Sequence, residues 1–254
     1  GRYAQCHEGA LRRQCCPRLM GQDAAQGAVD WHHQIADSFQ AGYNRSPGFM
    51  ERLALWRGLI GQAVQPGDRV LDAGCGAGTF SFLAAERAGQ VRALDGADAM
   101  IALCKAEQAK NGLSNISFET GMLDVLSDWE AAQFDVVLSS SVLEYVPAFE
   151  ETLAQMARVL KPGGRMIISM PNGLSRYRQL ERLAFRLTGK PRYYAYVCNI
   201  VTPDQLSQML AANGLSVGET HYYAEPPLPL GLGTLLGGPA RRRTLFAQVA
   251  RKAG

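Results

Sequence analysis

The sequence lacks any run of about 18 apolar residues, the length that a membrane-spanning helix needs. Arg2, Arg12 and Arg13 have no apolar stretch behind them, so no secretory signal is expected. The six cysteines have neither the spacing of a bridged framework nor that of paired zinc ligands. We therefore expect reduced thiols, no metal and a cytoplasmic location.

Strong charge of one sign is also missing. Charged residues make up only 19% of the chain and the net charge is +3, which gives no reason to expect a nucleic-acid partner. Hydrophobic residues make up 47%, so the chain has enough apolar surface to bury a core. A length of 254 residues fits one domain.

The chain divides into a tail, a helical cover and an alternating α/β region. Residues 1–29 show no apolar periodicity and are predicted to be a loose N-terminal tail; 30–254 form the domain. A helical cover is predicted over 30–64, with Ser46 as N-cap of its second helix and Pro47 as the first helical residue.

Strands and helices alternate after residue 68. Strands are predicted at 69–73, 90–95, 116–120, 134–139, 165–170, 215–223 and 244–250. Helices are predicted at 80–88, 97–111 and 149–160, with another capped by Thr202, and an insert at 171–199 interrupts the rhythm. This order predicts an α/β fold in which a doubly wound, mostly parallel sheet carries helices on both faces.

A glycine loop follows the first predicted strand. Asp72 is followed by Gly74, Gly76 and Gly78, which let the backbone pass close to a ligand. Asp95 ends the second strand, where a carboxylate accepts hydrogen bonds from the hydroxyls of a ribose. The spacing is G-x-G-x-G, whereas dinucleotide sites use G-x-G-x-x-G, which argues against a nicotinamide-dependent oxidoreductase.

Four runs resemble class I S-adenosylmethionine-dependent methyltransferases in order and spacing. They are VLDAGCGAGTFS, the acid in ALDGADAMI, FDVVLSSSVLEYV and the turn LKPGG, within a resemblance that extends from about Asp30 to Arg251. The resemblance implies a Rossmann-like methyltransferase fold with seven strands, the last one antiparallel. It also implies S-adenosylmethionine as the cofactor.

The same resemblance implies a set of cofactor contacts. The loop would wrap the methionine portion, Asp95 would hold the ribose, and the adenine would lie between two short segments. These residues are Asp72, Ala73, Gly74, Cys75, Gly76 and Gly78; Asp95; Gly96, Ala97, Met122 and Leu123; and Ser139 and Ser140 near the sulfonium. Asp124 is an alternative partner for the adenine amine, and Tyr43 and Arg45 are candidate covers, the arginine for the cofactor carboxylate.

The run Leu143-Glu144-Tyr145-Val146 is similar to LEHV in the quinone-pathway O-methyltransferases, which act on polyprenylated catechols. In that family, the glutamate, the histidine and an acid three residues upstream hold a divalent ion that lowers the pKa of the phenol. Here Ser141 and Tyr145 replace the acid and the histidine. Glu144 and Tyr145, together with His221 near the sixth strand, are the candidate catalytic residues; His32 and His33 are further candidate bases.

Residues 174–192 carry six basic residues and one acid, for a charge of +5. Leu174, Tyr177, Leu180, Ala184 and Leu187 recur at three- and four-residue steps, which predicts a basic amphipathic helix. Such a helix favours peripheral contact with an anionic membrane, or it forms a lid over the substrate. A second apolar stretch at 226–240 ends in three arginines.

The predicted function is methyl transfer from S-adenosylmethionine to a small lipophilic aromatic acceptor, with transfer to oxygen favoured. Transfer to carbon or nitrogen of another metabolite is the alternative within the class. A catalytically silent binding protein is the alternative outside it, although the retained glycines and Asp95 indicate that cofactor binding persists.

Overall fold

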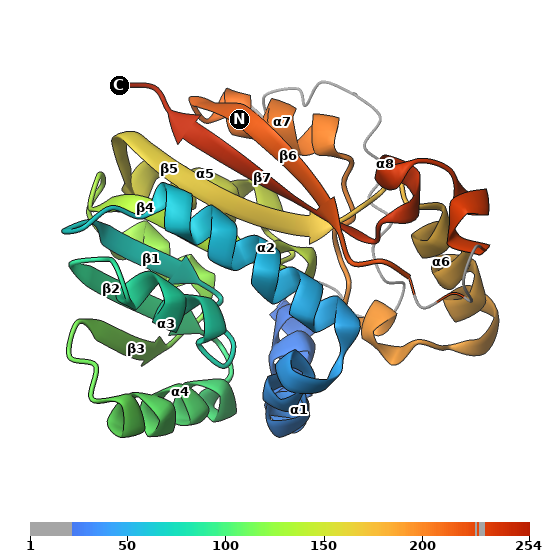
Figure 1. Cartoon of the computed structure of the whole chain (residues 1–254), viewed down its shortest axis with the longest axis horizontal. Coiled ribbons are helices and arrows are strands. Elements are labelled where there is room, and N and C mark those ends of the chain that lie inside the picture. Colours follow the sequence, from blue (N-terminus) through green and yellow to red (C-terminus); the bar gives the residue numbers. More distant parts are fainter. Residues whose placement is uncertain (1–21, 227, 229–231) are drawn as a thin grey trace, which may run out of the picture.

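The structure is a computed structural model that describes residues 22–226, 228 and 232–254. Within these residues no helix has the length and apolar character needed to cross a membrane. The fold is an α/β sandwich, in which helices cover both faces of one twisted sheet (Figure 1).

The sheet has seven strands in the order β3-β2-β1-β4-β5-β7-β6. All neighbouring pairs are parallel except β5 with β7 and β6 with β7, so the antiparallel last strand is confirmed. The strands are β1 (Arg69–Ala73), β2 (Gln90–Asp95), β3 (Ile116–Thr120), β4 (Phe134–Ser140), β5 (Leu160–Pro171), β6 (Leu215–Tyr223) and β7 (Leu245–Lys252).

Two apolar layers hold the helices against the sheet. One face packs on α2 (Pro47–Ala63), α3 (Thr79–Ala85) and α4 (Asp98–Asn111), and Trp56 stacks on Phe80 within this layer. The other face packs on η1 (Leu123–Asp128), α5 (Phe149–Val159) and α7 (Pro203–Ala212). The central strands are buried on both sides, which is why most of their residues are apolar.

The remaining helices lie beyond the carboxyl ends of the parallel strands (Figure 1). They are α1 (Gln22–Arg45), the short η2 (Leu143–Tyr145), α6 (Arg176–Thr188), η3 (Arg192–Ala195), η4 (Leu232–Leu236) and α8 (Pro239–Arg242). β1 and β4 are neighbours at the point where the strand order reverses, and in doubly wound sheets this is where ligands bind.

The helical cover begins earlier than predicted. α1 begins at Gln22, so residues 22–29 are not a tail; 1–21 lie outside the described residues. Ala28, the buried residue of the first turns, is small and gives only a weak periodic signal. The second helix begins with Ser46 as N-cap and Pro47 next, as predicted.

The turn predicted at 161–164 is instead part of β5, which already begins at Leu160. Phe134 pairs with Leu160 and Val136 with Arg165, so the residues between them are accommodated by a register shift in the ladder. The positive φ of Gly163 belongs to this irregularity.

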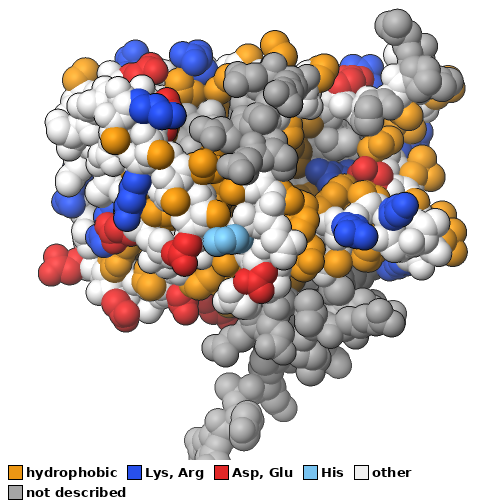
Figure 2. All heavy atoms as spheres, turned by 90° about the horizontal axis from the view of Figure 1, so that it is seen from below, with side chains coloured by type: hydrophobic (Ala, Val, Ile, Leu, Met, Phe, Trp, Pro, Cys, Tyr) orange, Lys and Arg blue, Asp and Glu red, His pale blue; other side chains and the backbone are white. Residues whose placement is uncertain are grey.

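The helix α6 of the insert is amphipathic, but its faces differ from the predicted ones. Leu180, Leu183 and Leu187 point outward and are 53–77% exposed. Arg178, assigned to the basic face by the sequence pattern, points inward, where its side chain is 13% exposed. The surface thus combines exposed leucines with the exposed bases Arg176, Arg186, Lys190 and Arg192, and basic side chains lie among hydrophobic ones at the right of Figure 2.

Candidate functional site

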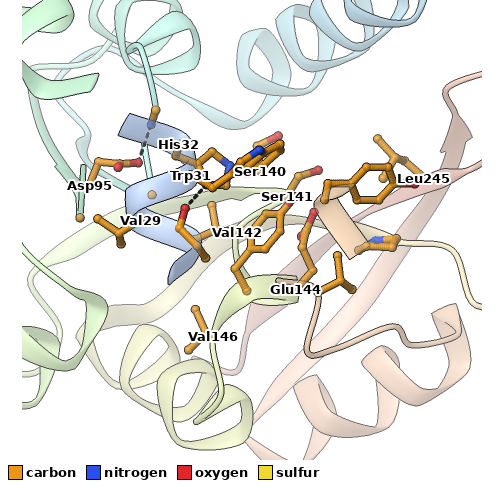
Figure 3. Close-up of a pocket in the computed structure, with 18 of the residues that line it drawn as sticks. Val29, Trp31, His32, Asp95, Ser140, Ser141, Val142, Glu144, Val146 and Leu245 are labelled. Carbon is orange, nitrogen blue, oxygen red and sulfur yellow. Dashed lines mark hydrogen bonds between the residues drawn. The ribbon is translucent and has the colours of Figure 1, made fainter. Parts of the chain in front are cut away.

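A cavity of about 1170 Å³ opens at the carboxyl ends of β1, β2 and β4. It exceeds the roughly 300–1,000 Å³ of most small-molecule sites, which leaves room for two ligands side by side. Asp95 stands at one end and Leu245 at the other, with Ser141 and Glu144 between them (Figure 3). α1 and the insert complete its walls.

The glycine loop forms the floor of the Asp95 end. Gly74, Gly76 and Gly78 all have φ between 53° and 82°, a backbone conformation that residues other than glycine rarely adopt. A Cβ on Gly74 would lie 2.4 Å from Val142 Cγ2, so no side chain fits there. Gly74 and Gly76 line the cavity with their backbone. Gly78 does not line it and is instead the N-cap residue of α3.

Asp95 is fixed from two sides. Its Oδ2 accepts a hydrogen bond from Gly76 N at 2.8 Å and its Oδ1 accepts one from Ala97 N at 2.9 Å. Burial raises the pKa of this carboxyl, and the two backbone donors act against that rise. Each oxygen keeps lone-pair capacity for a ligand hydroxyl, because a carboxylate oxygen accepts about two bonds.

Gly96 sits between two side chains that border the same end. A Cβ there would lie 2.8 Å from Val29 Cγ2 of α1 and 2.9 Å from Met122 Sδ after β3. Met122, Leu123 and Asp124 line the cavity, whereas Ala97 is buried and contributes only its N–H to Asp95. This combination forms a slot with an apolar wall, suited to a flat ring system.

Arg52 of α2 lines the cavity beside Ser140, and the sequence patterns did not single it out. Its guanidinium donates to Ser140 O at 2.8 Å and to Ser140 Oγ at 2.7 Å, and lies 5.4 Å from the centre of the Phe80 ring. The candidate covers Tyr43 and Arg45 belong to α1, and their side chains lie outside the described part.

Glu144 lies in η2 and lines the middle of the cavity. Its side chain is buried, and Oε2 has no hydrogen-bond partner. Burial raises its pKa to about 7, against the opposing positive charges of Arg178 and Arg52. Tyr145 beside it contacts the His32 ring at 4.9 Å, and burial raises the pKa of its hydroxyl.

The end of the insert holds the Glu144 turn in place. The carbonyl of Glu144 accepts hydrogen bonds from Cys198 N at 2.7 Å and Asn199 N at 3.0 Å. The Asn199 side-chain amide donates to the carbonyls of Leu143 (2.8 Å) and Val146 (2.7 Å), one on each side of Glu144. Asn199 lies in no recognisable motif, and sequence reasoning missed it.

Arg178 is the second positive charge in the wall. Its Nε donates to Thr244 O at 3.0 Å, its Nη1 donates to Tyr193 Oη at 2.8 Å, and Glu181 lies 4.0 Å away. Two of the three arginines at 241–243 also form ion pairs, because Arg242 and Arg243 both pair with Glu225.

Several predicted site residues do not line the cavity. Asp72 and Ala73 are buried in β1, with Asp72 accepting a hydrogen bond from Ser81 Oγ at 2.6 Å, and Ser139 is buried in β4. His221 lies on the edge strand β6 and pairs with Glu219 at 2.8 Å, so its position gives no support to a catalytic role.

A family model described as a methyltransferase domain matches residues 65–214, more than half of the chain. The chain belongs to this methyltransferase family. Its cofactor is S-adenosylmethionine, and the site fits that molecule: Asp95 stands beside a glycine floor, and the slot at Gly96 borders Met122.

Relatives and solved structures agree with this assignment. A ubiquinone biosynthesis O-methyltransferase from Hahella chejuensis is 35% identical over 174 residues, covering 66% of this chain and 71% of the relative. Alignments with other relatives of that name cover as little as 43% of their length.

The fold resembles a magnesium protoporphyrin IX methyltransferase from Synechocystis PCC 6803 solved with bound S-adenosylhomocysteine. That match has a TM-score of 0.69 and 16% identity, covering 91% of this chain and all of the other. The [4+2]-cyclase SpnF matches with a TM-score of 0.67 and 17% identity, covering 90% and 96%. The fold alone therefore does not define the reaction.

Proposed function

We propose that this methyltransferase acts on the hydroxyl oxygen of a lipophilic aromatic acceptor of the quinone-biosynthesis type. The observation that carries the proposal is the two-ended cavity. The cofactor end is formed by the glycine loop and Asp95, and the other end is walled by Leu245, Val197 and the insert. The relatives named as ubiquinone O-methyltransferases point to the same acceptor class.

The cofactor would lie with its ribose on Asp95 and its adenine in the slot at Gly96. Arg52, rather than Arg45, is our candidate for the cofactor carboxylate, because it is the arginine beside Ser140 in the cavity wall. When bound, S-adenosylmethionine supplies an activated methyl group on a positively charged sulfur. The chain then has to orient the acceptor and accept one proton.

Methyl transfer from isotopically labelled S-adenosylmethionine tests the acceptor class. We expect turnover of a catechol that carries one five-carbon prenyl chain, with a lower KM than the unsubstituted catechol, because the chain buries apolar surface at the Leu245 end. Equal KM values for the two catechols would contradict a lipophilic acceptor, and methylation of an amine alone would contradict an oxygen acceptor.

The outer face of α6 supports a second part of the proposal, peripheral contact with an anionic membrane. Exposed leucines normally cost solubility, and here they stand beside four exposed bases. A surface of this kind inserts apolar side chains below lipid headgroups while its cations pair with them. It would place the cavity close to an acceptor dissolved in the bilayer.

Co-sedimentation with phosphatidylglycerol vesicles tests the contact. We expect replacement of Leu180, Leu183 and Leu187 by Ser to abolish binding, whereas Met50→Ser, which alters an exposed apolar side chain on α2, leaves it unchanged. If binding survives the triple replacement, the leucines of α6 are not the membrane contact, and α6 serves only as a lid over the cavity.

A further inference from the structure

The residues around Glu144 do not fit a divalent ion. The positions at which the resembling family places an upstream acid and a histidine hold Ser141 and Tyr145. Across the part of the chain that the structure describes, no three His, Cys, Asp or Glu side chains gather as a possible ligand set. The positive charges near Glu144 come instead from Arg178 and Arg52. The way in which the acceptor hydroxyl loses its proton therefore needs another explanation.

We propose that Glu144 itself accepts the proton of the acceptor hydroxyl. This inference rests on the proposed O-methylation and adds the group that performs the proton transfer. Glu144 is 4% exposed, lines the cavity between its Asp95 end and its Leu245 end, and leaves Oε2 without a hydrogen-bond partner. An unpartnered buried carboxylate oxygen is costly unless a ligand satisfies it, and an acceptor hydroxyl is such a ligand.

The backbone around Glu144 is held in place by the end of the insert. Two backbone N–H groups of the insert donate to its carbonyl, and the Asn199 amide binds the carbonyls on either side. Ser141, three residues earlier, has φ of 57°, a conformation that residues other than glycine rarely adopt. A proton acceptor needs such preorganisation, because the rate of proton transfer depends on the distance between the carboxylate and the hydroxyl.

The groups that face Glu144 determine the pH at which it works. Arg178 of α6 and Arg52 of α2 favour its ionised form, and burial favours the neutral form and dominates. Tyr145 and His32 of α1 are neighbouring titratable groups; burial raises the pKa of Tyr145 and lowers that of His32, and both shifts favour the neutral form. A base that ionises near pH 7 is well matched to the proton of a phenol.

The step is balanced without a metal or a redox partner. The acceptor O–H bond breaks, and its proton moves to a carboxylate oxygen of Glu144. The electron pair left on oxygen forms the new O–CH3 bond, the S–CH3 bond breaks, and the sulfonium becomes a neutral thioether. Glu144 then releases the proton to water. Arg178, the cation that acts most strongly on Glu144, stabilises the transient negative charge on the acceptor oxygen.

The experiment compares the wild-type protein with Glu144→Gln, using the prenylated catechol and labelled S-adenosylmethionine. We expect kcat to fall by about 10²–10⁴-fold while cofactor affinity, measured by calorimetry, stays unchanged. Wild-type kcat should rise with pH around a midpoint near 7, and this transition should be missing in the variant. Glu150→Gln, the same change at an exposed position of α5, is the matched control.

A second arm separates this inference from metal assistance. Wild-type turnover should be unaffected by EDTA and by added Mg²⁺ or Zn²⁺. Loss of activity in EDTA with recovery on adding either ion would overturn the inference, as would a Glu144→Gln variant with wild-type kcat. If Glu144→Gln fails to fold, Glu144→Asp replaces it; that variant should keep the pH transition at a reduced rate. Absence of any wild-type methylation of the catechol would instead overturn the proposed acceptor, and this inference with it.

Discussion

Replacing Asn199 by Ala is expected to destabilise the protein and to slow catalysis for the same reason. The substitution removes two hydrogen bonds, to the carbonyls of Leu143 and Val146, at a half-buried site. At about 1 kcal/mol for each bond, the free energy of unfolding should fall by about 2 kcal/mol. For a chain of this length, that corresponds to a Tm lower by about 4–8 °C.

Asn115→Ala is the matched control. Asn115 is also half-buried, and its amide donates to two carbonyls, Ala85 O at 2.9 Å and Ala88 O at 3.0 Å. These bonds lie at the opposite ends of the strands, away from the cavity. We expect a similar loss of stability from this variant with kcat unchanged, whereas Asn199→Ala should lose about tenfold or more in kcat, because the Glu144 turn is no longer held in register.

Urea unfolding followed by fluorescence and methyl-transfer kinetics measure the two effects separately. Two outcomes would refute the reasoning. Equal kcat in the two variants at equal stability loss would mean that Asn199 does not position Glu144. A stability loss below about 0.5 kcal/mol in both variants would mean that these amide bonds contribute little beyond their exchange with water.

Three further predictions concern the cofactor end and the buried acids. Asp95→Ala should weaken S-adenosylmethionine binding in calorimetry, since it removes the carboxylate that faces the cavity and releases Gly76 N and Ala97 N; unchanged affinity would exclude Asp95 as the ribose partner. Gly74→Ala should destabilise by about 2–5 kcal/mol, because it adds a clash with Val142 to an unfavourable φ, while Gly61→Ala, which has open space around it in α2, should stabilise by up to about 1 kcal/mol. Burial raises the pKa of Asp72 to about 7 from an unfolded value near 3.8. The unfolded state therefore loses its proton first as pH rises, so stability should fall between about pH 4 and 7; in urea titrations Asp72→Asn should flatten this slope, and an unchanged slope would assign it to other groups.

The buried part of the fold was predictable because its strands are short apolar runs between turn signals. The bounds of β1, β2, β3 and β6 match their predicted ranges, and the Thr202 cap of α7 is present as a reciprocal capping box. These features depend on local pattern alone. The start of α1 was missed because the buried residue there, Ala28, is small and gives little periodic signal.

The walls of the site were less predictable than its floor. The glycine loop and Asp95 can be recognised from residue type and spacing, and the structure places Gly74, Gly76 and Asp95 at the cavity. Arg52 and Asn199 act through contacts between segments that are 88 and 53 or more residues apart, and no local pattern encodes such contacts. Arg178 was misassigned for a related reason: helical periodicity defines the faces of a helix, but tertiary packing decides which of them turns inward.

The insert cannot be treated as a detachable module. Its helix α6 carries the exposed leucines, its middle supplies Tyr193 to Arg178, and its last residues hold the turn that presents Glu144. Deleting it to test membrane contact would also remove part of the cavity wall and the backbone donors behind the reaction centre. A deletion variant that loses activity would therefore say nothing about lipid. Only substitutions on the outer surface of α6 separate the two, and chimeras with relatives would have to exchange the insert together with the Leu143–Val146 segment.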